Sequence, residues 1–178
     1  MIKEYDKVFP ERLCEDIRKI INGKNLEVIN NGVQDGVLTC DLEETDAPFK
    51  EVEHLAKVMV DEYFNNFLPL PYETFVEAYT LLRYPENTFC KTHCDREWVV
   101  NNGQDVVRLL NIIIFLNDDF TEGKLIFEDQ KLVVSPAIGN AVGFPCSFIV
   151  PHSVTMVLNG ARDALSISVG IKKPTESY

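Results

Sequence analysis

The stretch VVRLLNIIIFLN, residues 106–117, consists mostly of β-branched and aliphatic side chains. Such a run is typical of a β-strand. Further short runs of the same kind lie on both sides, separated by Gly, Pro, Asn and Asp: FVEAYTLLRY, GKLIF, KLVV, NAVGF, SVTMVL and ALSISVGI. Many short strands in succession favour a β-barrel or a jelly roll.

The first 70 residues have a different pattern, and we expect them to be mainly helical. PERLCEDIRKIIN begins with Pro10, which suits the first turn of a helix, and Gly23 supplies a stop. LEVI and GVLTC, which follow, are expected to be short strands. A second helix is predicted in APFKEVEHLAKVMVDEYFNNF, with one apolar face formed by Phe49, Val52, Ala56, Met59 and Tyr63.

Together these patterns predict an α+β, mainly β fold in one domain, residues 1–178. Residues 1–70 would form a helical support region packed on one face, and residues 71–178 a β core that carries the site. A length of 178 residues fits a single domain.

Composition and charge exclude several classes of protein. The formal net charge of −11 disfavours a nucleic-acid partner, because such binding depends on Lys and Arg that neutralise phosphates. No apolar run approaches the roughly 20 residues of a membrane span, and the first residues lack the apolar core of a signal peptide. The five scattered cysteines suggest reduced thiols. We therefore expect a cytoplasmic protein without a membrane partner.

RYPENTFCKTHCDREW, residues 83–98, contains a candidate metal site. Residues two apart in a strand point to the same side, so His93 and Asp95 could direct an imidazole and a carboxylate at one point. A solvated strand end explains the pair equally well. Further on, His152 precedes a strand, and Arg162 opens the last strand after an Asn-Gly turn. We expect these strands to form a hairpin that places His152 and Arg162 in one cavity.

The residue types indicate which metal would bind. Two histidines and one carboxylate leave three coordination positions open, which suits non-haem Fe(II) and O2. A buried arginine requires an anion, and a dicarboxylate ligand would supply one. A structural zinc site is the alternative, but it usually has four ligands with paired cysteines. Cys90 and Cys94 are near His93, although Cys94 would face away from it. His54 lies off the apolar stripe of its helix and is expected at the surface.

Several motifs within residues 74–170 occur in a fixed order. LLRYPENTFCKTHCD is followed by RLLNIIIFLNDDFTEGKLIF and then by GNAVGFP, after which come His152 and Arg162. In this order the motifs resemble those of the Fe(II)- and 2-oxoglutarate-dependent oxygenases, and specifically the prolyl 4-hydroxylase-like branch. The resemblance implies a double-stranded β-helix (jelly roll) core. It also implies Fe(II), 2-oxoglutarate and O2 as cofactor and cosubstrates, with ascorbate as an optional reductant.

The resemblance also implies roles for individual residues. His93, Asp95 and His152 match the iron ligands of the family. Arg162 matches the basic residue that pairs with the distal carboxylate of 2-oxoglutarate and so orients it. The implied reaction couples decarboxylation of 2-oxoglutarate to succinate with hydroxylation of an aliphatic C–H.

Further residues are assigned to the cosubstrate pocket on the same basis. Tyr84 matches a pocket aromatic, Ser166 shares the face of Arg162, and Asn111 is expected to face the barrel interior. Two positions depart from the family pattern. Phe115 stands where some relatives have a tyrosine that bonds the cosubstrate, and Glu122 replaces the first glycine of a Gly-Gly turn.

The substrate implied by the resemblance is a prolyl residue in a peptide or protein. A free amino acid or another small molecule is the first alternative, and the acidic balance weakens the case for a nucleobase. A non-catalytic jelly-roll binding module is the other alternative. Residues 96–107 follow Asp95 directly, so Trp98 is expected either in a substrate lid or packed on the barrel rim.

Overall fold

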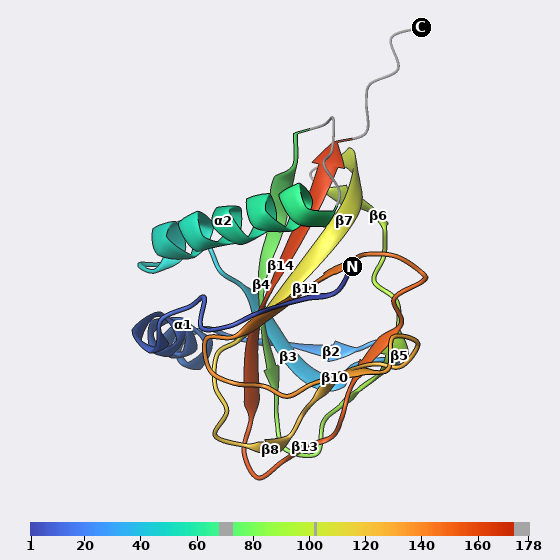
Figure 1. The fold of residues 1–178 in the computed structure, drawn as a ribbon. Coiled ribbons are helices and arrows are strands. Elements are labelled where there is room, and N and C mark those ends of the chain that lie inside the picture. The colour runs from blue at the N-terminus through green and yellow to red at the C-terminus, as the bar shows by residue number, and fades with distance from the viewer. Residues whose placement is uncertain (68–72, 102, 173–178) are drawn as a thin grey trace, which may run out of the picture.

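A computed structural model describes residues 1–67, 73–101 and 103–172 (Figure 1). Within these residues, two helices, α1 (Glu11–Gly23) and α2 (Phe49–Phe67), accompany two larger antiparallel sheets and one strand pair. The main sheet has the order β1-β11-β7-β14-β4-β3-β2, and β6 pairs with β7. Its strands are β1 (Lys3–Tyr5), β2 (Glu27–Asn30), β3 (Asp35–Asp41), β4 (Phe75–Tyr84), β6 (Trp98–Asn101), β7 (Gln104–Phe115), β11 (Ala141–Pro145) and β14 (Arg162–Lys172).

The small sheet has the order β10-β9-β12-β5. Its strands are β5 (Cys90–His93), β9 (Leu125–Phe127), β10 (Leu132–Val134) and β12 (His152–Val154). The remaining pair joins β8 (Thr121–Glu122) to β13 (Val157–Leu158).

The main sheet separates two apolar cores. On one face, Ile112 and Ile114 of β7 pack against the buried residues of α1 and α2, which lie on the same side of the sheet (Figure 1). On the other face, Phe115 packs with buried residues of the small sheet such as Phe127. Successive residues of a strand point to opposite faces, so the run in β7 serves both cores. The predicted jelly-roll core with helices on one face is confirmed.

The two predicted helices are present and bury the expected stripes. In α1, Leu13, Ile17 and Ile21 are buried, and the helix begins directly after Pro10. All five residues predicted on the apolar face of α2 are buried: Phe49, Val52, Ala56, Met59 and Tyr63. No helix in the described part of the chain is both long and apolar enough to span a membrane.

The N-terminal region contributes more than helices. β1 pairs with β11, while β2 and β3 extend the main sheet beyond β4. The predicted short strands LEVI and GVLTC correspond to β2 and β3, but β1 was not anticipated. Residues 1–70, predicted as a helical support region, therefore also contribute strands to the main sheet.

Two local predictions were wrong. His152 and Arg162 do not belong to one hairpin, because β12 pairs with β5 and β9 whereas β14 pairs with β4 and β7. The predicted strand SVTMVL is divided into β12 and β13, and the second half pairs with β8. Separately, residues 96–107 include a hairpin in which β6 pairs with the start of β7, and whether this segment covers the site stays a prediction.

Candidate active site

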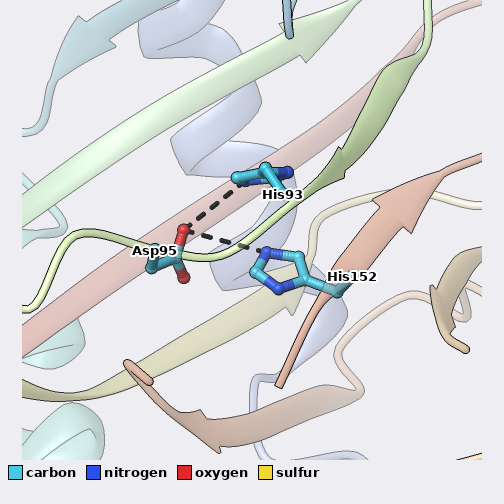
Figure 2. A group of neighbouring side chains, drawn as sticks. All are labelled: His93, Asp95 and His152. Carbon is cyan, nitrogen blue, oxygen red and sulfur yellow. Dashed lines mark ion pairs between the residues drawn. The ribbon is translucent and has the colours of Figure 1, made fainter. Parts of the chain in front are cut away.

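His93, Asp95 and His152 form a compact cluster (Figure 2). β5 and β12 place the two histidines directly opposite each other in register, and their ring centroids are 4.4 Å apart. Asp95 lies just beyond the end of β5, and not within the strand as predicted from its spacing to His93. Its Oδ1 is 3.5 Å from Nε2 of His93 and 3.8 Å from Nε2 of His152. The three side chains thus direct one donor atom each toward a common point.

Backbone carbonyls set the orientation of both imidazoles. Nδ1 of His93 lies 3.0 Å from the carbonyl oxygen of Lys91, and Nδ1 of His152 lies 3.1 Å from that of Val150. A carbonyl oxygen only accepts, so each Nδ1 carries the hydrogen. The Nε2 of each ring therefore faces Asp95, and it is the nitrogen that would bind a metal after losing any proton it carries.

In the absence of a metal, burial and polar contacts determine the pKa values of the three clustered side chains. Burial lowers the pKa of His93, but hydrogen bonds with Asp95 and Cys90 outweigh it and raise the pKa to about 10. Burial raises the pKa of Asp95, yet hydrogen bonds from His93 and Asn111 and the nearby His152 bring that pKa below its usual value. Burial lowers the pKa of His152. In the metal-free cluster His93 therefore holds a proton that faces ionised Asp95, and a divalent ion would displace it.

Arg162 places a buried cation beside the cluster. It is 2% exposed, and its Nε has no hydrogen-bond partner among the described residues. Its Cζ lies 4.9 Å from the ring centroid of Tyr84 and 5.4 Å from that of Phe115. Burial lowers the pKa of Arg162. Aromatic faces compensate only part of the lost hydration, so the guanidinium is suited to an anionic ligand.

A cavity of about 80 Å³ connects the histidine–aspartate cluster with Arg162. Although His152 and Arg162 belong to different sheets, both line it. Every site residue predicted from the sequence lines this cavity: Tyr84, His93, Asp95, Asn111, His152, Arg162 and Ser166. The geometry brings these residues together, while their individual roles stay predictions.

One further histidine, two cysteines and one glutamine complete the description of the site and its surroundings. His54 is exposed on α2, as expected, and Cys94 is exposed between two residues of the cluster. Gln34, in the turn between β2 and β3, was missed; its Nε2 donates to the Tyr84 hydroxyl at 3.0 Å. Cys90 is buried in the cavity wall, with Sγ 3.4 Å from Nδ1 of His93. No local sequence signal connects Gln34 with the site, because Gln34 and its partner Tyr84 are 50 residues apart in the chain.

The turn that replaces the Gly-Gly motif keeps a left-handed backbone. Glu122 has φ of 61° and Gly123 has φ of 59°. A Cβ at Gly123 would lie 2.8 Å from Cε2 of Phe120 and 3.1 Å from Cδ of Arg162, so this glycine makes room for the arginine stem. Glu122 adopts its conformation at a cost of roughly 1–2 kcal/mol.

The residues present fit both groups that the sequence implied. Two neutral imidazole nitrogens and one carboxylate oxygen are ligands suited to Fe(II), and no fourth His, Cys, Asp or Glu joins them among the described residues. That count disfavours a structural zinc site. The incompletely paired guanidinium at the other end of the cavity fits a carboxylate of 2-oxoglutarate.

Solved structures of oxygenases share this fold. The viral collagen prolyl hydroxylase of Paramecium Bursaria Chlorella virus-1, solved with 2-oxoglutarate, is 13% identical, with a TM-score of 0.74 and 96% of each chain covered. A prolyl hydroxylase of Trichoplax adhaerens, in complex with a hypoxia-inducible-factor peptide, is 12% identical, with a TM-score of 0.74, covering 96% of this chain and 83% of that one. HygX of Streptomyces hygroscopicus, solved with nickel, 2-oxoglutarate and hygromycin B, is 12% identical, with a TM-score of 0.66, covering 96% and 82%.

The sequence itself matches a known protein family. No curated protein matches the chain by sequence. Residues 79–169, just over half of the chain, match the profile of the 2OG-Fe(II) oxygenase superfamily. This region contains all the cavity residues predicted from the sequence. Enzymes of the family use Fe(II), 2-oxoglutarate and O2. The chain belongs to the 2OG-Fe(II) oxygenase superfamily.

Proposed function

We propose that the enzyme hydroxylates a prolyl residue in a peptide or protein, with Fe(II) held by His93, Asp95 and His152. One observation carries the assignment of these residues. A three-donor cluster lines the same cavity as a buried arginine whose Nε has no partner in the described part of the chain. This combination matches the joint requirements of a labile divalent metal and a dicarboxylate cosubstrate.

The iron, when bound, supplies the activation of O2 that couples conversion of 2-oxoglutarate to succinate and CO2 with C–H hydroxylation. Arg162 would pair with the distal carboxylate of 2-oxoglutarate and so set its orientation. The Tyr84 hydroxyl already accepts a hydrogen from Gln34, which leaves its own hydrogen available for an acceptor in the cavity. Tyr84 could thereby supply the hydrogen bond that Phe115 cannot make. Ser166 lines the same cavity and is assigned to the cosubstrate.

Exposed aromatic side chains on the segments that carry the proposed metal ligands support a peptide substrate. Trp98, three residues after Asp95, is 60% exposed, and Phe148 is 80% exposed. The Cys94 thiol donates to the carbonyl of Phe148 at 3.5 Å, which ties this residue to the segment that carries Asp95. Trp98 also lines an open groove with Arg96 and other residues of the hairpin. Aromatic faces of this kind suit the apolar ring of a prolyl residue.

A small-molecule substrate is the second candidate, since HygX shares the fold and was solved with hygromycin B. The excess of 28 acidic over 17 basic residues disfavours nucleic acid. All five cysteines are free, which supports a reducing, cytoplasmic location. Ascorbate as a reductant stays an expectation from the family.

The substrate proposal can be tested by incubating the protein with Fe(II), 2-oxoglutarate, ascorbate and panels of peptides, small molecules or oligonucleotides. Succinate formation should rise with proline-containing peptides, and the responding peptide should gain the mass of one oxygen atom. Trp98→Ala should reduce the peptide-stimulated rate but leave 2-oxoglutarate binding intact. Phe67→Ala, which removes an exposed aromatic of α2, is the matched control and should change neither.

Base oxidation in oligonucleotides, or stimulation by small molecules alone, would contradict the peptide assignment. The proposed iron and Arg162 sites would survive either result, because they depend on other residues.

A further inference from the structure

Asn111 is a buried amide on the interior face of β7. It is 6% exposed and lies between Leu110 and Ile112 in a strand that is otherwise apolar along this stretch. A buried amide is costly unless its donor and acceptor are both paired. Its Nδ2 donates to Oδ2 of Asp95 at 2.6 Å, and its Oδ1 accepts from Oγ of Ser168 at 2.8 Å. Ser168 is also buried, at 7% exposed.

The direction of these hydrogen bonds is fixed by chemistry. An ionised carboxylate only accepts, so the amide must present its nitrogen to Asp95 and its oxygen to Ser168. Asn111 and Ser168 are opposite each other in the register of β7 and β14, two long strands at the centre of the main sheet. The sheet therefore holds both members of the pair in place.

Asp95 itself lacks such support from its own backbone, because it lies in a segment without regular structure after β5. Its two oxygens have different surroundings. Oδ1 faces Nε2 of both His93 and His152, whereas Oδ2 receives the amide hydrogen of Asn111. A carboxylate that is free to rotate can bind a metal through both oxygens. The hydrogen bond from Asn111 opposes that rotation.

We propose that Ser168 and Asn111 form a positioning relay that presents only Oδ1 of Asp95 to the metal. The relay would keep Oδ2 from occupying a coordination position that the cosubstrate or O2 needs. This proposal rests on the metal-binding role of Asp95 proposed above. It also revises the expected role of Asn111, which becomes a positioning residue for a metal ligand and not a contact to 2-oxoglutarate.

The experiment measures Co(II) binding to the full-length protein without turnover. Affinity comes from titration, and the d–d absorption of bound Co(II) reports its ligand number and geometry. Asn111→Leu, which keeps the bulk but removes the donor, should weaken Co(II) binding by about 10- to 100-fold and change the spectrum. Ser168→Ala should do the same to a smaller extent, and Ser168→Thr, which keeps the hydroxyl, should restore both readouts.

Thr39→Ala is the matched control, because it removes a hydroxyl of the main sheet that donates to the carbonyl of Leu81 at 3.1 Å, outside the cavity. It should leave Co(II) affinity and spectrum unchanged. Folded Asn111→Leu with wild-type affinity and spectrum would overturn the relay. If Asn111→Leu does not fold, the two Ser168 variants decide, and equal Co(II) binding by Ser168→Ala and wild type would overturn it.

Asp95→Ala separates this proposal from the proposed function. Loss of Co(II) binding in Asp95→Ala but not in the relay variants would overturn the relay alone. Unchanged Co(II) binding in Asp95→Ala would overturn the metal site itself, and the relay with it.

Discussion

Replacing Arg162 with methionine should stabilise the ligand-free protein and cut its stabilisation by 2-oxoglutarate to about half or less. The guanidinium is 2% exposed, its Nε is unpaired among the described residues, and Tyr84 and Phe115 are its aromatic neighbours. Exchange of buried ionic groups for apolar side chains of similar volume is often neutral or stabilising by about 1–4 kcal/mol. In a domain of this size each kcal/mol raises the Tm by roughly 2–4 °C.

Binding of 2-oxoglutarate should stabilise the wild-type protein more than Arg162→Met. The wild-type protein with a divalent metal should gain about 2.7 kcal/mol when 2-oxoglutarate is present at 100 times its Kd. Arg162→Met loses a charge-assisted hydrogen bond of roughly 1.5–3 kcal/mol, so its Kd should rise about ten- to a hundred-fold. At the same concentration of 2-oxoglutarate, the stabilisation of Arg162→Met should therefore fall to about 0.4–1.4 kcal/mol.

Differential scanning calorimetry with and without 2-oxoglutarate measures both effects. Arg83→Met is the matched control, because Arg83 forms an ion pair with the buried Asp163 at 2.7 Å. This variant leaves a buried carboxylate short of a partner, so its Tm should fall while its response to 2-oxoglutarate remains. A lower ligand-free Tm for Arg162→Met would show that the buried guanidinium stabilises the protein, and an undiminished response to 2-oxoglutarate would show that Arg162 does not bind it.

Three further outcomes are expected. Glu122→Gly should stabilise the protein by about 1 kcal/mol in urea unfolding, because it relieves the left-handed backbone at φ of 61°; an unchanged midpoint would count against strain there. The pKa of His93 is raised to about 10, so its proton stabilises the metal-free protein fully below about pH 6.5 and less as the pH approaches 10. Metal binding near pH 7.5 should consequently release about one proton, detectable by calorimetry in buffers of different ionisation enthalpy, and no release would contradict the shift. Gln34→Leu should weaken 2-oxoglutarate binding several-fold through the lost hydrogen bond to Tyr84, and equal affinity would exclude that role.

The hydrophobic periodicity of the sequence predicted the helices and strands better than it predicted which strands pair. The apolar run in β7 and the stripe of α2 were correctly assigned, because periodicity alone determines which side of an element is buried. The hairpin proposed for His152 and Arg162 was wrong, since strand pairing in a jelly roll joins segments that are far apart in sequence. The two residues still line one cavity because the two sheets face each other across it.

The polar contacts in the site also depend on strand pairing that the sequence does not reveal. Ser166 and Ser168 both share the strand face of Arg162, so spacing could not show which serine meets a polar partner. The register of β14 against β7 decides it, because it places Ser168 opposite Asn111. Gln34 could not be found from the sequence, since its contact to Tyr84 depends on how β3 pairs with β4.

Anaerobic titration of the Fe(II)-loaded protein with 2-oxoglutarate, followed by the visible charge-transfer absorbance of the iron–cosubstrate complex, measures whether iron and cosubstrate bind together at Asp95 and Arg162. The wild-type protein should develop a saturable band at one cosubstrate per chain. Arg162→Met should need about ten- to a hundred-fold more 2-oxoglutarate to reach half of the band, and Asp95→Ala should develop no band. A band of wild-type intensity and midpoint in Asp95→Ala would show that the iron and the cosubstrate bind elsewhere.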